Sequence, residues 1–132
     1  MSFSLLFLAS SALGAESIRP FSTDGCSSFP DGTYYNRDLW LSCCIAHDLA
    51  YWKGGTFEDR QAADMELQRC VSDLGESSVS ILIYIGVRAG GSPYFPTTYR
   101  WGYGWSFFRG YKELTPIEIK NINEVYSSTH NN

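Results

Sequence analysis

The residues whose types and spacing are best suited to chemistry lie together in the segment CCIAHDLAY, residues 43–51. Side chains three or four positions apart share one face of a helix, so His47 would lie beside both cysteines and Tyr51. Histidine is the side chain best placed to act as a base near neutral pH. Asp48, about 100° further around the helix, offers hard oxygen atoms that suit calcium. The pattern therefore suggests a general base next to a cation ligand.

Two plainer interpretations of this segment stay open. His47 and Asp48 are also compatible with a structural histidine next to a surface aspartate. The four cysteines could bind zinc, although the adjacent Cys43 and Cys44 lack the spacing of about two to four residues typical of zinc knuckles. If they are bridged instead, these cysteines would anchor the helix rigidly, which suits a site that needs fixed geometry.

The N-terminus indicates the compartment. Residues 1–15, MSFSLLFLASSALGA, carry no charged side chain, and their apolar stretch runs into small residues that end at Ala15. This is typical of a secretory signal peptide cleaved after Ala15, the alternative being a buried N-terminal helix. We expect residues 16–132 to form a single secreted or periplasmic domain whose four cysteines form two disulfides.

The composition excludes several classes of protein. The chain has 132 residues and a net charge of −4, and this acidic excess argues against a general nucleic-acid-binding protein. Aromatic residues make up 16% of the chain and charged residues only 18%, which is too apolar for a disordered protein. The apolar runs fall short of the roughly 20 residues that a spanning helix needs, so we expect no transmembrane anchor.

The hydrophobic pattern predicts a mainly α fold with two antiparallel helices at its centre. Apolar residues recur at intervals of three and four over 38–52, and Gly54-Gly55 would end this helix. Thr56 then has the character of an N-cap, followed by acidic residues and a second helix that ends near Leu74. Helices joined by so short a turn are usually antiparallel neighbours.

The second half of the chain is expected to add helices around an aromatic loop. Residues 79–87 could form a buried helix or a strand, and we prefer the helix because the glycines at 90–91 resemble a C-terminal stop. Residues 92–111 read as a loop rich in aromatic residues and glycine, and a Thr-Pro pair predicts a further helix over 115–126.

Three features in a fixed order make the first half similar to secreted phospholipase A2. The segment CCIAHDLAY resembles the active-site helix of that family, whose pattern is Cys-Cys-x-x-His-Asp-x-x-Tyr. Residues 60–64, RQAAD, resemble the element with a second aspartate, which is followed here by Cys70. The loop DGCSSFPDG, residues 24–32, occupies the place of the family's calcium loop. The match covers roughly residues 24–71, and it looks nearest to the small, few-disulfide bacterial and fungal members.

The resemblance implies a role for each residue of the motif. His47 would be the general base that takes a proton from the water attacking an ester carbonyl. Asp64 would accept a hydrogen bond from the other imidazole nitrogen. Tyr51 would hydrogen-bond to Asp64, the alternative being an ordinary core tyrosine. Asp48 would bind calcium, and the cation would polarise the carbonyl and stabilise the oxyanion.

The calcium loop is where this sequence departs from the family. The resemblance implies that backbone carbonyls of Gly25, Ser27 and Phe29 complete the calcium site. Ser27 and Phe29 stand where the family has glycines, which permit a positive φ at a sharp turn. Asp24 or Asp31 could therefore supply a carboxylate that the family loop lacks, the alternative being that both are turn residues.

The resemblance also implies a pairing of the cysteines. Sequence alone allows three pairings of four cysteines. By analogy with the family, the disulfides would be Cys26–Cys44, which joins the calcium loop to the first helix, and Cys43–Cys70, which joins the two helices.

Together these features imply a secreted, calcium-dependent lipolytic esterase that hydrolyses the sn-2 acyl ester of glycerophospholipids at a membrane or micelle surface. One alternative is a non-catalytic calcium- or lipid-binding, or toxin-like, module on the same scaffold. Such proteins usually lose the base or the calcium aspartate, whereas His47, Asp48 and Asp64 are all present here. A third alternative is an extracellular domain that shares only the two-helix core. We expect a monomer, with no strong attraction to anionic membranes because of its negative charge.

The aromatic and basic residues of the second half have two interpretations each. Trp101 and Trp105 could pack in the core or contact acyl chains and lipid, where tryptophan is favoured. Arg100, Arg109 and Lys53 could contact phosphate or lie on the solvated surface.

Overall fold

The structure is a computed structural model that describes residues 16–130; the predicted signal peptide, residues 1–15, lies outside this range. Within it the chain is helical and has no strand, which confirms the mainly α prediction. None of these helices is long and apolar enough to cross a membrane. The elements are α2 (Leu41–Lys53), α3 (Phe57–Asp73), α4 (Ser77–Gly90), the short 3₁₀ helix η1 (Phe107–Arg109) and α5 (Pro116–His130).

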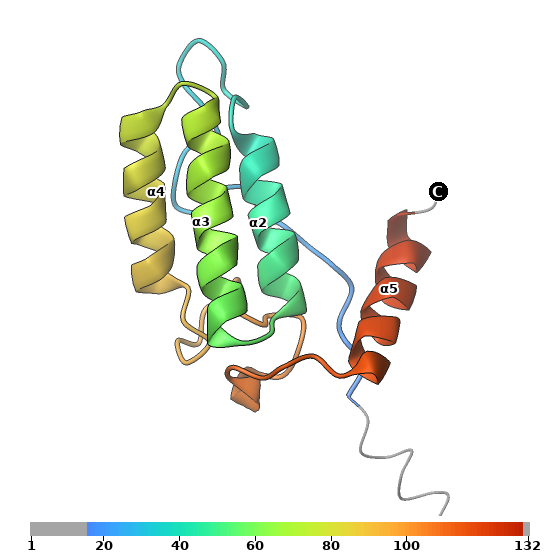
Figure 1. Cartoon of the computed structure of the whole chain (residues 1–132). Coiled ribbons are helices and arrows are strands. Elements are labelled where there is room, and N and C mark those ends of the chain that lie inside the picture. Colours follow the sequence, from blue (N-terminus) through green and yellow to red (C-terminus); the bar gives the residue numbers. More distant parts are fainter. Residues whose placement is uncertain (1–15, 131–132) are drawn as a thin grey trace, which may run out of the picture.

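Helices α2, α3 and α4 form one layer with α3 in the middle (Figure 1). The predicted pair of antiparallel helices is α2 and α3, which are joined by residues 54–56. Thr56 caps α3 as expected: its hydroxyl accepts a hydrogen bond from the backbone N–H of Asp59, and the Asp59 carboxylate accepts one from Thr56 N–H. Helix α2 begins at Leu41 rather than at 38, because residues 37–40 form a turn.

The apolar segment that could have been a helix or a strand is helix α4, as preferred. Ile83 on its inner side joins Leu67 and Val71 of α3 in a buried cluster. The helix at the C-terminal end, α5, stands apart from the three-helix layer (Figure 1). It begins with the predicted cap, in which the backbone N–H of Glu118 donates to the hydroxyl of Thr115.

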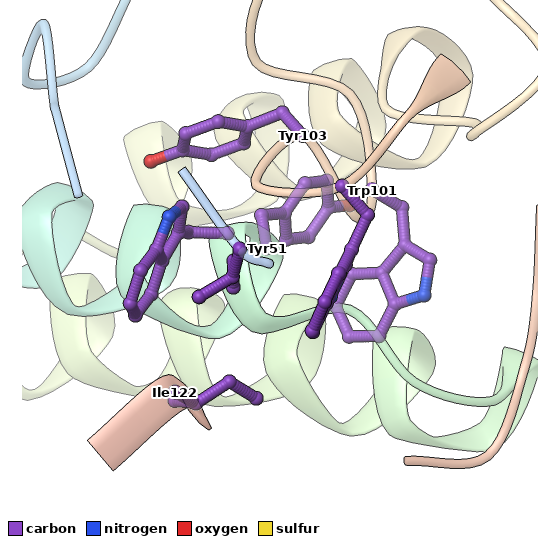
Figure 2. Close-up of a cluster of buried hydrophobic side chains, with 7 residues drawn as sticks. Tyr51, Trp101, Tyr103 and Ile122 are labelled. Carbon is purple, nitrogen blue, oxygen red and sulfur yellow. The ribbon is translucent and has the colours of Figure 1, made fainter. Parts of the chain in front are cut away.

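An aromatic core lies where the loop over residues 91–115 passes across one end of the layer (Figure 1). Figure 2 shows this cluster, to which α2 contributes Tyr51 and α5 contributes Ile122. Trp101 and Trp105 are 2% and 0% exposed. Their indole N–H groups donate to backbone carbonyls, Trp101 to Gly55 O (3.0 Å) and Trp105 to Lys53 O (2.8 Å). These two tryptophans are core residues, so the interpretation as lipid contacts is wrong.

The arginines of this loop are buried against structural partners, so the interpretation of Arg100 and Arg109 as solvated surface residues is wrong. Arg100 is buried and donates to the carbonyl of Trp105 at 2.9 Å. Arg109 pairs with Glu118 and lies over the Trp105 ring, 4.4 Å from its centroid. The side chain of Arg109 is only 6% exposed. Arg100 thus has a carbonyl partner, and Arg109 has a carboxylate and an aromatic face, although Nε and Nη2 of Arg109 are buried without a hydrogen-bond partner.

Candidate active site

His47, Asp64 and Tyr51 meet between α2 and α3. Nε2 of His47 lies 2.7 Å from Oδ1 of Asp64. The hydroxyl of Tyr51 donates to the same oxygen at 2.6 Å. The rings of His47 and Tyr51 pack with their centroids 4.2 Å apart. The structure thus brings together the histidine, the aspartate and the tyrosine that we identified in the sequence, and Tyr51 is hydrogen-bonded to the aspartate.

The hydrogen bonds of Asp64 determine the tautomer of His47. Burial by itself would raise the pKa of Asp64, but hydrogen bonds from His47 and Tyr51, with one from Arg88, hold its pKa below the ordinary value. An ionised carboxylate only accepts hydrogen bonds, so Nε2 of His47 carries the proton of this contact. In the neutral ring the other nitrogen, Nδ1, is therefore unprotonated and can accept a proton.

Two arginines that sequence reasoning missed complete the surroundings of Asp64. Nη1 of Arg88, on α4, donates to Oδ2 of Asp64 at 2.8 Å. Nε of Arg60 lies 3.8 Å from the same oxygen and donates to the hydroxyl of Tyr51 at 3.0 Å. Arg60 stands four positions before Asp64 on α3, so helical spacing could have indicated it. Arg88 is the one charged residue in the sequence of α4, which is the signal that could have indicated it.

Two disulfides tie the elements of this region together. One joins Cys26 of the loop to Cys44 of α2, and the other joins Cys43 of α2 to Cys70 of α3. These are the pairs that the resemblance implies. The second bridge lies four residues before His47 and six residues after Asp64, so it holds the two helices together close to the histidine–aspartate contact.

The loop ahead of α2 turns through two residues in the left-handed region. Gly25 has φ +72°, and Ser27, with φ 57°, is alone among the non-glycine residues of the described range in having a positive φ. Ser27 is thus in the conformation for which glycine is favoured. Its hydroxyl donates to Asp24 at 2.8 Å. Asp31 folds back onto its own loop and accepts a hydrogen bond from the backbone N–H of Cys26 at 3.0 Å.

Asp48 is a buried carboxylate that faces this loop. Its Oδ2 accepts a hydrogen bond from the hydroxyl of Thr23 at 2.6 Å. Burial is the main reason that the pKa of Asp48 rises to about 6, and the negative charge of Asp24 raises it further, while the Thr23 hydrogen bond opposes the shift. The neighbouring His47 also lowers the pKa of Asp48, but it does not offset the burial of a carboxylate that lies next to a second acidic group. Such a pair of oxygen donors is suited to a bound cation.

The donors available here fit calcium better than a soft metal. No group of three or more His, Cys, Asp or Glu side chains converges anywhere in residues 16–130. A cation at Asp48 would therefore depend on backbone carbonyls, and hard oxygen atoms of this kind suit calcium. Gly25, Ser27 and Phe29 all line the same cavity as Asp48, as the predicted ligand set requires. Asp24 lines it too, whereas Asp31 does not, so Asp24 is the candidate for the extra carboxylate.

His47, Asp48 and Tyr51 line a cavity of about 580 Å³. One wall is the loop over residues 24–29, and another is the face of α2 that carries His47, Asp48 and Tyr51. Helix α4 supplies an apolar wall that includes Ile83 and Val87. Neither Arg100, Arg109 nor Lys53 lines this cavity. The cavity thus combines a base, a carboxylate and an apolar wall.

Comparison with known proteins identifies no relative of this chain. The chain matches no protein-family model, no curated protein and no solved structure. What the site can do therefore has to be argued from its own residues.

Proposed function

We propose that the protein is a secreted, calcium-dependent, phospholipase A2-like esterase that hydrolyses the sn-2 acyl ester of glycerophospholipids. The observation that carries the proposal is the 2.7 Å contact between the buried Asp64 and His47, which lines a cavity together with Asp48. Its two disulfides support a secreted protein, because disulfides persist in oxidising compartments.

His47 performs the proton transfer in this proposal. Nδ1 takes a proton from a water molecule as that water attacks the ester carbonyl, and it later returns the proton to the leaving alcohol. Asp64 holds the imidazole in the required tautomer and stabilises the imidazolium that forms, as the aspartate of a catalytic triad does. Burial and the nearby Asp64 carboxylate raise the pKa of Tyr51, so the phenol stays protonated and remains a donor.

Asp48, with the carbonyls of Gly25, Ser27 and Phe29, would hold the calcium ion. A bound calcium ion supplies a Lewis acid for the negative charge that develops on the ester carbonyl oxygen. The Cys26–Cys44 bridge places the loop against α2 and so fixes these oxygen atoms relative to His47. Asp24 adds negative charge that strengthens attraction for the cation.

A lipid is the substrate class that best suits the cavity. Its apolar α4 wall can accept an acyl chain, because burying hydrocarbon there is favourable. The outer side of the same helix exposes Ile81, Leu82 and Ile85 to between 50% and 58%. An apolar surface beside a cavity is a typical contact for lipid or protein.

Calcium binding tests the proposed metal site separately from catalysis. Titration calorimetry should detect one calcium ion bound by the wild-type protein. Asp48→Asn should lose this binding, and Asp38→Asn, in the turn before α2, should keep it. Equal calcium affinity in Asp48→Asn and the wild type would contradict the assignment.

A further inference from the structure

The carboxylate of Asp64 uses its two oxygen atoms for different purposes. Oδ1 accepts from His47 and Tyr51, and Oδ2 accepts from Nη1 of Arg88 at 2.8 Å. The residue is 0% exposed, so water cannot replace any of these donors. A hydrogen bond from a charged donor is among the strongest available to a carboxylate. Arg88 therefore holds Oδ2, the carboxylate oxygen of Asp64 that His47 does not contact.

Arg60 anchors the end of helix α4 close to Asp64. Its Nη2 donates to the carbonyls of Val87 and Arg88, at 2.8 Å and 2.9 Å. These carbonyls belong to the last turn of α4, where a positive charge is favourable. The Nε atom of Arg60 donates to Tyr51 instead of Asp64, from which it is 3.8 Å away. Arg60 thus anchors the backbone that carries Arg88 and leaves Oδ2 to Arg88.

Loss of Arg88 would leave Oδ2 with one cationic neighbour, Arg60. Turning the carboxylate towards Arg60 would move Oδ1 away from Nε2 of His47, since both oxygen atoms rotate together. The Arg88 side chain is 24% exposed, whereas that of Arg60 is 4% exposed. Removing Arg88 therefore leaves fewer buried groups without a partner than removing Arg60 would. A change at Arg88 can therefore disturb the orientation of Asp64 while the helices stay packed.

We propose that Arg88 is a positioning residue for the His47–Asp64 pair. Its N–H group on Oδ2 fixes the plane of the carboxylate so that Oδ1 holds the imidazole in place. In this way α4, which forms one wall of the cavity, is coupled to the base on α2. The effect on turnover rests on the proposed esterase function, whereas the effect on the hydrogen bond does not.

The test compares Arg88→Met and Arg88→Lys with the wild type and with Arg69→Gln. Arg69 lies on α3 in an exposed pair with Glu66, which makes it a matched control. The first readout is the proton NMR resonance of His47 Nε2–H, assigned by its absence in His47→Gln. The second is kcat and KM on dioleoylphosphatidylcholine vesicles with calcium. Thermal unfolding of each variant checks that the fold persists.

We expect Arg88→Met to shift or lose the His47 resonance and to lower kcat by about tenfold, with KM changed less than twofold. Arg88→Lys should retain part of the His47 resonance and part of kcat. Arg69→Gln should change neither the resonance nor kcat. The inference is overturned if the His47 resonance of Arg88→Met is the same as that of the wild type. If Arg88→Met does not fold, the same criterion applies to Arg88→Lys. A resonance that responds in a protein without hydrolytic activity supports the inference and contradicts the proposed function instead.

Discussion

Nε2 of His47 lies 2.7 Å from Oδ1 of Asp64, although 17 positions separate the two residues along the chain. The contact joins α2 to α3, and the Cys43–Cys70 bridge joins the same two helices nearby. Preorganised groups of this kind cost little reorganisation when a reaction takes place. The contact is thus held in place by the scaffold before any substrate binds.

Tyr51→Phe should destabilise the protein by about 1–3 kcal/mol, because it removes a donor from the buried Asp64 and an acceptor from Arg60. Urea unfolding measures this difference. Tyr34→Phe is the control, since Tyr34 is 82% exposed and its hydroxyl should contribute less than about 0.5 kcal/mol. Equal unfolding midpoints for the two variants would mean that the Tyr51 hydrogen bonds add nothing to stability.

Replacing either of two adjacent glycines at the end of α4 with alanine should have different effects on the stability of the protein. A Cβ on Gly91 would lie 2.6 Å from the hydroxyl oxygen of Tyr51, whereas a Cβ on Gly90 would meet no atom within 4 Å. The Cβ on Gly91 would also lie 2.7 Å from the backbone carbonyl oxygen of Val87, which cannot swing aside as a side chain can. Gly91→Ala should therefore cost about 1–3 kcal/mol through overpacking. Gly90→Ala should be neutral or stabilising by up to about 1 kcal/mol. Thermal unfolding decides between these outcomes, and a Gly91→Ala protein as stable as Gly90→Ala would contradict the overpacking argument.

The two disulfides provide a matched pair of variants. Each closes a loop of similar length, with separations of 18 and 27 residues. Replacing either pair with alanine should lower stability by about 3 kcal/mol. Only loss of Cys26–Cys44 should also weaken calcium binding, because that bridge holds the loop beside Asp48. Calorimetry at a temperature where both variants are folded measures the affinity, and equal affinities in the two variants would count against the proposed calcium loop.

The pair formed by Arg109 and Glu118 should make stability depend on acid pH. The hydrogen bond from Arg109 is the main reason that the pKa of Glu118 falls to about 2. A carboxyl group whose pKa is lowered on folding stabilises the protein above its ordinary pKa, and this stability is lost as the pH falls towards the folded value. Wild-type stability should thus decrease between about pH 4.5 and pH 2.

Glu118→Gln isolates this contribution. It should be less stable than the wild type by about 2 kcal/mol at pH 7, because it leaves the Arg109 charge with weaker partners, and the difference should shrink towards pH 2. Denaturant unfolding at several pH values follows the trend. A difference that stays constant from pH 7 to pH 2 would show that the charge of Glu118 is not responsible.

Local features of this fold were predictable from the sequence, and the family resemblance also pointed to the His47–Asp64 contact and to both disulfides. The other contacts between distant elements were not predictable. The capping of α3 by Thr56 and the shared face of His47 and Tyr51 depend only on neighbours along one helix. Trp101 and Trp105 add to the aromatic composition equally whether they lie in a core or on a lipid surface. Packing among distant segments, which include α2 and α5, is what buries them. Arg88 reaches Asp64 from 24 positions away through the packing of α4 on α3.

The most direct test of the proposed function is the identity of the fatty acid that the protein releases. Purified protein is mixed with phosphatidylcholine that carries different acyl chains at sn-1 and sn-2, and mass spectrometry identifies the released acid. We predict release of the sn-2 acid with calcium, no release in excess chelator, and no release by a folded His47→Gln variant. Absence of any released acid, or full release either in chelator or by His47→Gln, would contradict a calcium-dependent esterase that uses His47 as its base.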